Sequence, residues 1–431
     1  MAGIDYDQTG GKDKKILIVG SGGREHALAW KIAQSPLCQE LYVAPGNAGT
    51  AQWNVPLKAN DFDSLVQFAR ENAVDLTIVG PEEPLSLGLV DAFLAADLKI
   101  FGPTKEAAQL ESSKAFAKKI MEEAKVPTAR YQTFTEITAA REFISKVGAP
   151  IVIKADGLAA GKGVIVANQL EEAMEGLEKL MGGAFGSAGE KVVIEEYLEG
   201  QEVSLLCFCD GQTAVPMVAV QDHKRALDGD KGLNTGGMGT YSPPPFWTKE
   251  LEQEVIDRIA LPTLRVMQEK GMPFKGVLFL GLMITEQGPK LLEYNVRFGD
   301  PETQVVMMLL KSDLLPILEA CTEGSLNQSK IDWHAETAIC VIMASRGYPG
   351  SYETGIPLTL PELTAENQVI FQAGTALKET GLVSSGGRVL GVTVREESLA
   401  KARESAYKLI KQIDFPKAHY RTDIGLKGLK T

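Results

Sequence analysis

The chain has 431 residues, of which 44% are hydrophobic and 23% charged, a balance typical of globular proteins with a sizeable core. Since domains usually contain roughly 100–200 residues, this length predicts about three of them. The net charge of −12 and the lack of a Lys/Arg-rich run argue against a nucleic-acid surface. No apolar run reaches the roughly 18 residues that a membrane span needs, so we expect neither nucleic acid nor membrane as a partner.

Five cysteines are scattered along the chain, an odd number that argues against a disulfide framework and favours a reducing cytoplasm. Cys207 and Cys209 share one face of a strand-like apolar run, where packing is a better explanation than metal binding. The first 14 residues are polar and fit neither a secretory signal nor a transit peptide, so we expect a disordered extension at 1–14. These features predict a cytoplasmic protein, which we expect to act as a monomer on small molecules.

Strands alternate with helices between residues 15 and 125, which predicts a doubly wound α/β domain with a parallel sheet. Short apolar runs predict its strands at 15–20, 41–44, 76–79 and 99–101. In such a domain the ligand binds where the carboxyl ends of the strands meet.

A glycine-rich turn joins the first of these strands to a helix, and the backbone NH groups at such a junction can hold a phosphate. Gly20 and Gly22 match the first two glycines of the dinucleotide-binding fingerprint, but Glu25 stands where the third is needed. The loops 45–49 and 80–84 follow later strands and should meet the same ligand. This favours a ligand other than a dinucleotide, with a nicotinamide-dependent oxidoreductase as the alternative.

Residues 150–166 predict a β-hairpin with a glycine-rich loop, after one long helix at 105–125 that carries Lys114. The loop contains Gly157, Gly161, Lys162 and Gly163. It resembles a P-loop only superficially, because it lacks the Ser/Thr and joins two strands instead of opening a helix. A hairpin of this kind can still cover phosphates, and Lys154 at the end of its first strand can reach them. The alternative is a surface hairpin without function.

A strand predicted at 192–197 ends close to Leu198, and its edge can offer backbone groups to a flat base. Glu202 is then available for a ribose. The alternative is that this strand edge is solvated and has no ligand. Residues 221–239 are polar and glycine-rich, which predicts a long irregular loop. Its His223 is a single histidine and does not make a metal site.

Three polar side chains, Glu293, Asn295 and Arg297, share one face of a strand predicted at 291–297, and Leu292 belongs to the opposite, apolar face. Glu and Asn are hard oxygen ligands of the kind that Mg²⁺ takes together with phosphate oxygens and water. The arginine can hold a carboxylate or phosphate with a bidentate fork. The alternative is an edge strand with a solvated face.

A further αβ module begins near residue 336, with a strand-like run at 386–394 and a closing helix at 398–412, and predicts a separate C-terminal domain.

Taken together, these residues carry a family resemblance. The Lys154 strand with its GLAAGKG hairpin, the EEYL strand and the Glu-x-Asn-x-Arg strand resemble the ATP-grasp superfamily. GGREHALAW, QDHKR, NTGGMG and above all RFGDPETQ resemble the glycinamide ribonucleotide synthetase family of purine biosynthesis, over about residues 15–426.

The resemblance implies an α/β and α+β multidomain protein with an ATP-grasp fold. We expect an N-terminal substrate-binding domain at 15–125, a small lid subdomain at 126–200, a central subdomain at 201–335 and a C-terminal αβ domain at 336–431.

The resemblance also implies roles for individual residues. Those expected to bind ATP are Lys114, Lys154, Gly157, Gly161, Lys162, Gly163, Glu195, Glu196, Leu198, Glu202 and Leu282. Those expected to bind the other substrates are Gly22, Gly23, Arg24, Glu25, Gly46, Asn47, Asp222, Lys224, Gly299, Asp300 and Pro301. Glu293 and Asn295 match the metal ligands for Mg²⁺ or Mn²⁺, and Arg297 and Lys154 are the expected catalytic residues.

The activity that this family implies is ATP-dependent ligation of glycine to 5-phosphoribosylamine through a glycyl phosphate. The strand before the metal ligands, GVLFLGLMIT, has no carboxylate where many ATP-grasp relatives have one, so metal binding should depend on ATP oxygens. The alternatives are an ATP-grasp ligase for another acid and a nucleotide-binding module without turnover.

Overall fold

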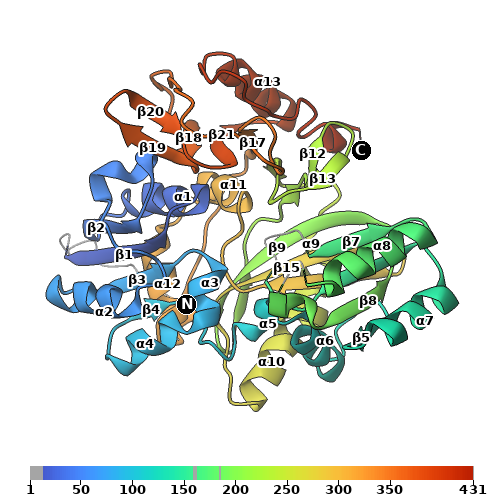
Figure 1. Cartoon of the computed structure of the whole chain (residues 1–431). Helices are drawn as coiled ribbons and strands as arrows, with labels where there is room; N and C mark the ends of the chain where they lie inside the picture. The colour runs from blue at the N-terminus through green and yellow to red at the C-terminus, as the bar shows by residue number, and fades with distance from the viewer. Residues whose placement is uncertain (1–12, 159–162, 184–185, 431) are drawn as a thin grey trace.

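The structure is a computed structural model that describes residues 13–158, 163–183 and 186–430 (Figure 1). The extension predicted for residues 1–14 lies outside the described residues except at its end, where Lys14 already belongs to the first strand. Gly161 and Lys162 of the predicted phosphate loop also lie outside them. None of the described helices is both long and apolar enough to cross a membrane.

The N-terminal sheet is parallel, in the order β2-β1-β3-β4. Its strands are β1 (Lys14–Gly20), β2 (Cys38–Pro45), β3 (Leu76–Val79) and β4 (Ile100–Phe101). The helices around it are α1 (Gly23–Ile32), η1 (Ala48–Trp53), α2 (Phe62–Glu71), α3 (Glu82–Leu87) and α4 (Leu89–Ala95). Both faces of the central strands are buried, as the continuous apolar runs predict. The doubly wound parallel sheet is therefore confirmed.

The prediction of a single helix at 105–125 is wrong, because the segment is interrupted in its middle. Two helices, α5 (Gln109–Ser112) and α6 (Lys114–Glu123), are separated by Ser113, whose backbone is extended. The Ser113 hydroxyl accepts a hydrogen bond from the Phe116 NH, and the Asp156 carboxylate accepts one from the Ala115 NH at 2.7 Å. A serine N-cap competes with helix continuation in this way, and it places Lys114 at the start of α6.

The small sheet is antiparallel, in the order β5-β8-β6-β7. Its strands are β5 (Tyr131–Phe134), β6 (Ile151–Ala155), β7 (Val164–Ala167) and β8 (Val192–Glu196). The helices α7 (Ile137–Val147) and α8 (Leu170–Met181) close its core, and η2 (Gly186–Gly189) precedes β8. The predicted hairpin at 150–166 is confirmed by the pairing of β6 with β7.

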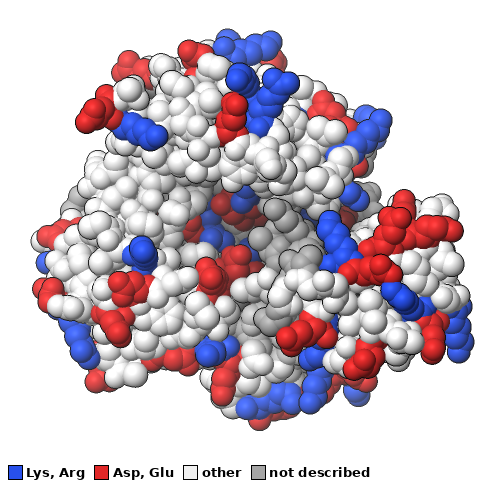
Figure 2. All heavy atoms as spheres, in the orientation of Figure 1, with Lys and Arg blue, Asp and Glu red and all other residues white. Residues whose placement is uncertain are grey.

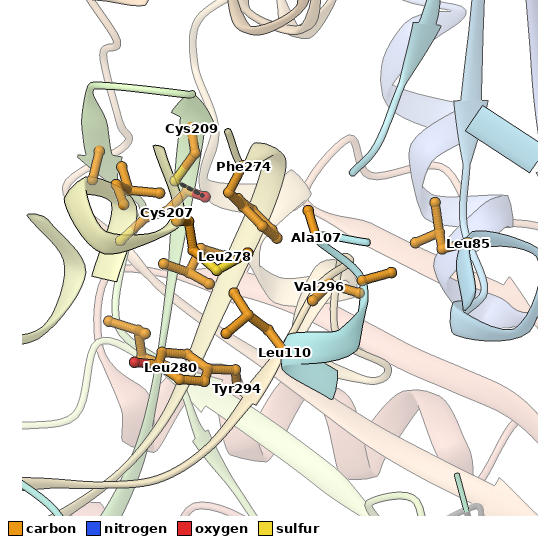
Figure 3. Packing of buried hydrophobic residues seen from close by; sticks show 14 of the residues in the cluster. Leu85, Ala107, Leu110, Cys207, Cys209, Phe274, Leu278, Leu280, Tyr294 and Val296 are labelled. Carbon is orange, nitrogen blue, oxygen red and sulfur yellow. Dashed lines mark hydrogen bonds between the residues drawn. The ribbon is translucent and has the colours of Figure 1, made fainter. Parts of the chain in front are cut away.

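The central sheet is antiparallel, in the order β10-β9-β15-β16. Its strands are β9 (Gln201–Asp210), β10 (Ala214–Pro216), β15 (Lys275–Thr285) and β16 (Gly288–Asn295). The helical segment α9 (Lys249–Val255), η3 (Ile256–Ala260) and α10 (Leu261–Glu269) packs on one face, and α11 (Glu302–Leu309) and α12 (Leu314–Glu323) pack on the other. Cys207 and Cys209 point into the first of these cores beside Phe274 and Leu278, so their prediction as packing residues is confirmed (Figure 3).

The strand β16 departs from strict alternation at Leu292. Gly281 of β15 pairs with Glu293, but the next residue, Leu282, pairs with Leu291, which leaves Leu292 as an extra residue on β16. Such a β-bulge re-aims the side chains on either side of it.

The bulge sends two neighbouring leucines to different places. Leu291 is fully buried in the same core as Tyr294, whereas Leu292 packs against a separate small cluster. The prediction that Leu292 belongs to the apolar face of this strand, on which Tyr294 lies, is therefore wrong. The strand also ends at Asn295, so Arg297 lies in the turn that follows.

The C-terminal sheet has the order β11-β14-β17-β21-β18. Its strands are β11 (Gln221–Asp222), β14 (Gly239–Ser242), β17 (Thr337–Ala344), β18 (Gln368–Gln372) and β21 (Arg388–Glu396). One face is covered by α13 (Leu399–Ile410) and the other by α11. Small elements complete the fold: η4 (Leu326–Gln328), η5 (Lys427–Leu429), and the hairpins β12 (Arg225–Leu227)–β13 (Lys231–Asn234) and β19 (Thr375–Lys378)–β20 (Gly381–Ser384).

The segment 221–239 is not the irregular loop that its composition predicts. It contributes two strands to the C-terminal sheet and forms the β12–β13 hairpin between them. The sheet at the C-terminus thus takes strands from two distant parts of the chain.

The bulge predicts unequal effects for two adjacent substitutions. Leu291→Ala should lower the free energy of unfolding by about 2–5 kcal/mol, since it empties a fully buried site. Leu292→Ala, at a partly buried site, should lower it less. Urea unfolding of the two variants measures the difference, and a larger loss for Leu292→Ala would contradict the bulged register.

Candidate active site

A cavity of about 1350 Å³ lies where the four sheets meet (Figure 2). Its walls carry acidic and basic side chains from the N-terminal part of the chain, the small sheet, the central sheet and the C-terminal sheet. The predicted site residues that line it are Arg24, Lys114, Lys154, Gly163, Glu195, Glu196, Leu198, Glu202, Asp222, Lys224, Glu293, Asn295, Arg297 and Asp300. Residues that lie more than 270 positions apart are thus brought to one site.

Other predicted residues do not line the cavity. Gly22, Gly23, Glu25, Gly46, Asn47, Gly157, Gly299 and Pro301 are not among the residues that line it. The buried Glu25 carboxylate accepts hydrogen bonds from the Gly22 NH and the Arg24 Nε, both at 2.5 Å. A Cβ at Gly20 would lie 2.6 Å from Glu25 Cγ, so this glycine makes room for the carboxylate. The buried Glu25 side chain therefore stabilises the first glycine-rich turn.

Leu282 lies in the hydrophobic core of the central sheet and is fully buried there. Its neighbour Met283 lines the cavity instead, together with Leu292 and Phe279. The apolar surface that the cavity offers to a ligand here therefore comes from these three residues, whereas the Leu282 side chain does not reach it.

Three lysines line the cavity next to the small sheet, and two of them pair with one carboxylate. Glu195 Oε2 lies 3.0 Å from Lys154 Nζ, and Glu195 Oε1 lies 3.2 Å from Lys118 Nζ. The third lysine, Lys114, donates a hydrogen bond to the Gly157 carbonyl at 3.2 Å. This arrangement concentrates positive charge beside the glycine hairpin, as binding of a polyphosphate requires.

Burial changes the proton affinity of these lysines. It lowers the pKa of Lys118 to about 8, although the Glu195 carboxylate opposes the shift. It also lowers the pKa of Lys114, while Glu293 favours the charged form. Both lysines hold their charge more weakly than exposed lysines, which makes an anionic ligand a favourable partner.

Glu293 and Asn295 present two oxygen donors on the cavity wall. Burial disfavours the Glu293 charge, but Lys224, Lys154 and Lys114 outweigh it and lower the pKa of this carboxyl. A Cβ on the facing Gly281 would lie 3.2 Å from Glu293 Cγ, so the glycine leaves space for the carboxylate.

These two donors suit a divalent cation that also takes phosphate oxygens. Within residues 13–158, 163–183 and 186–430, no cluster of three or more His, Cys, Asp and Glu side chains could hold a metal ion.

Arg297 is held between acids from two other parts of the chain. Its guanidinium lies 2.9 Å from Glu111 Oε1 and 3.3 Å from Glu82 Oε2, and it donates to Asn295 Oδ1 at 3.3 Å. Burial opposes the arginine's charge, but these carboxylates raise the pKa of Arg297 above its usual value. The arginine is therefore charged and fixed in orientation beside the oxygen donors of β16.

A second group of charges lies on the C-terminal side of the cavity. Arg388 pairs with Asp300 at 3.5 Å and donates to the Asp300 carbonyl at 2.7 Å. Burial opposes the Asp300 charge, but Arg388 and Arg24 lower the pKa of its carboxyl. Glu302 and Asp222 lie nearby, and burial together with their mutual repulsion raises the pKa of Asp222 well above its usual value.

Sequence reasoning missed several cavity residues. They are Glu111, Lys118, Glu302 and Arg388, whereas Glu82 lies in the loop 80–84 that was expected to meet the ligand. Helical spacing offered a signal for one of them, since Lys118 follows Lys114 by four positions and shares its helix face. The pairing of Glu111 with Arg297 spans 186 positions and leaves no such local signal.

Comparison with known proteins gives the site a family. Models of the phosphoribosylglycinamide synthetase N domain, ATP-grasp (A) domain and C domain match residues 14–111, 112–303 and 338–427. The chain belongs to the phosphoribosylglycinamide synthetase family. The resemblance seen in the sequence is thereby confirmed, and the ATP-grasp fold with it. Members of this family use ATP with a divalent metal ion.

Relatives of this chain match it over nearly their full length. Phosphoribosylamine–glycine ligase of Rhizobium meliloti (strain 1021) is 52% identical over 418 residues, which are 96% of this chain and 99% of that protein. The enzyme of the same name from Pasteurella multocida (strain Pm70) is 50% identical, with 96% and 98% covered.

Solved structures agree with this assignment. The crystal structure of phosphoribosylamine–glycine ligase from Thermotoga maritima has a TM-score of 0.83 and 36% identity, covering 95% of this chain and 100% of that one. Biotin carboxylase from Campylobacter jejuni, solved as a β,γ-ATP complex, has a TM-score of 0.71, 14% identity and coverage of 97% and 96%, a likeness of fold alone.

Proposed function

We propose that the protein is an enzyme that ligates glycine to 5-phosphoribosylamine with ATP, giving glycinamide ribonucleotide, ADP and phosphate. The observation that carries this proposal is the family match across all three domains, over a cavity that contains charged groups from each of them. The reaction belongs to purine biosynthesis.

ATP would lie between the small sheet and the central sheet. Lys114 and Lys154 would hold its phosphates under the 157–163 hairpin. Glu195, Glu196 and Leu198 would meet the adenine edge, where the Glu195 carboxylate is fixed by its ion pairs with Lys118 and Lys154. Glu202 would hold the ribose, in place of its present pairing with Lys224 at 3.4 Å.

Glu293 and Asn295 would hold Mg²⁺ or Mn²⁺, together with oxygens of ATP. When bound, the metal would neutralise charge on the phosphates during transfer. Since these two residues supply few donors by themselves, a metal should bind weakly to the protein without nucleotide.

The chemistry would proceed in two steps. The glycine carboxylate attacks the γ-phosphorus of ATP, which forms a glycyl phosphate and releases ADP. The amine of 5-phosphoribosylamine then attacks the acyl carbon, releases inorganic phosphate and loses a proton to give the amide. Such transfers need positioning and charge stabilisation more than a protein nucleophile, and Arg297 with Lys154 would supply both.

The N-terminal loops with Gly22, Gly46 and Asn47 would shape the site of the sugar phosphate. Asp222, Lys224 and Asp300 would contact the two acceptor substrates. In this division the segment 126–200 acts as the lid, 201–335 as the ATP-grasp centre and 336–431 as the C-terminal domain. We further propose that the enzyme acts as a monomer in the cytoplasm, where the buried thiols of Cys207, Cys209, Cys321 and Cys340 stay reduced.

The proposal is tested by ADP formation from Mg-ATP with and without glycine, and with and without 5-phosphoribosylamine generated in place. The proposal requires ADP release that depends on both. Release with another acid in place of glycine would indicate a different ATP-grasp ligase. ATP binding without any release would indicate a nucleotide-binding module, and NAD binding in place of ATP binding would indicate an oxidoreductase.

Arg297→Lys should lower turnover by on the order of a hundredfold or more, because a lysine keeps the charge but loses the oriented fork that would stabilise the acyl phosphate. The lysine still pairs with Glu111, so the fold should persist. Arg258→Lys, on an exposed helical surface, is the matched control. Unchanged turnover in a folded Arg297→Lys enzyme would contradict the role of Arg297.

Glu293→Gln should raise the Mg²⁺ concentration needed for half-maximal activity by about tenfold or more, since an anionic ligand becomes neutral. Glu286→Gln, at an exposed turn of the same hairpin, should leave the titration unchanged. An identical Mg²⁺ titration for wild type and Glu293→Gln would remove Glu293 from the metal site.

A further inference from the structure

A buried ring of contacts joins Lys118 to the proposed ATP site. Lys118, Glu195 and Lys154 are 2%, 3% and 7% exposed at their side chains, and the carboxylate of Glu195 lies between the two ammonium groups. Two buried cations therefore share one buried anion. The group keeps an excess of one positive charge, and it lines the cavity.

Backbone carbonyls at the bulge of β16 close the ring. Lys118 Nζ donates to Thr128 Oγ1 at 2.8 Å, and Thr128 Oγ1 donates to the Leu291 carbonyl at 2.6 Å. On the other side, Lys154 Nζ donates to the Leu292 carbonyl at 3.0 Å. The two adjacent carbonyls anchor the two lysines to the same point of the central sheet.

The ring links separate elements of the fold. Lys118 comes from α6, Lys154 from β6 and Glu195 from β8, so α6 and the small sheet are tied to β16. The Lys118 ammonium also lies 5.3 Å from the centre of the Tyr131 ring on β5. The Lys118 ammonium thus contacts Glu195, Thr128 and Tyr131.

We propose that Lys118 is a positioning residue for ATP. Lys118 shares the Glu195 carboxylate with Lys154, so part of the positive charge of Lys154 remains uncompensated and can attract the nucleotide. This inference rests on the proposed ATP site. If Lys118 is removed, Glu195 and Lys154 form a closed neutral pair, and Lys154 attracts phosphate less strongly. The effect reaches ATP through Glu195 and needs no contact between Lys118 and the nucleotide.

The test is the equilibrium affinity for ATP, measured by competition with a fluorescent ATP analogue. Lys118→Met should raise the Kd for ATP on the order of tenfold, the effect of weakening one charge-assisted contact. The KM for glycine should not change. Lys119→Met, the neighbouring exposed lysine on the same helix, is the matched control and should bind ATP as the wild type does. Lys118→Gln serves the same purpose if Lys118→Met does not fold.

The double variant Lys118→Met/Glu195→Gln separates this role from the alternatives. Glutamine keeps an oxygen acceptor but no charge, so Lys118→Met should change the ATP affinity little when it is added to the Glu195→Gln single variant. A structural role for Lys118, or a direct contact with ATP, predicts that Lys118→Met still raises the Kd in the Glu195→Gln background. Either that result or an unchanged Kd in Lys118→Met would overturn the inference, whereas a wild-type protein that binds no ATP would overturn the proposed function itself.

Discussion

The ion pairs of Arg297 with Glu111 and Glu82 are the interaction on which the arrangement of the cavity depends. A buried guanidinium must be paired, and its partners here come from the start of α3 and from α5, while the arginine follows β16. The Glu111 carboxylate also accepts the Val296 NH at 2.8 Å. One charged group therefore holds the N-terminal sheet, the helical connection and the central sheet in a single geometry.

The helix α11 extends this arrangement to the C-terminal sheet. All of its residues are buried, because it packs against α1 on one side and against β17 and β21 on another. Its residues from Val305 to Leu309 are all apolar, as is typical of a helix that lies inside a protein. Its first residue, Glu302, faces the cavity, so the packing of this helix and the charges of the site are set by the same short segment.

Local patterns predicted most of the elements in the described residues. The parallel strands of the N-terminal sheet, the hairpin at Lys154 and the strand with Glu293 follow from apolar runs and alternation, because these signals lie within a few residues of one another. Local patterns did not predict that distant residues share one cavity, because residues far apart along the chain share no local pattern. That prediction came from the family resemblance, for Lys114, Lys154, Glu293, Asn295 and Arg297.

The predictions that were wrong failed for the same reason, because each depends on contacts with a distant part of the chain. Leu292 was assigned to the wrong face because a bulge depends on the partner strand. The helix at 105–125 breaks at Ser113 because Asp156, far along the chain, accepts an NH of the second helix. The strands at 221–242 were missed because a polar, glycine-rich sequence becomes a strand only when β17 is beside it.

The central claim is that the cavity transfers a phosphoryl group from ATP to the carboxylate of glycine. Turnover of glycine labelled with ¹⁸O at both carboxyl oxygens, in the presence of ATP and 5-phosphoribosylamine, tests it directly by mass spectrometry of the inorganic phosphate. A glycyl phosphate predicts that one labelled oxygen enters the phosphate in each turnover and one stays in the amide. Unlabelled phosphate would show that the carboxylate is not phosphorylated, and would contradict the account.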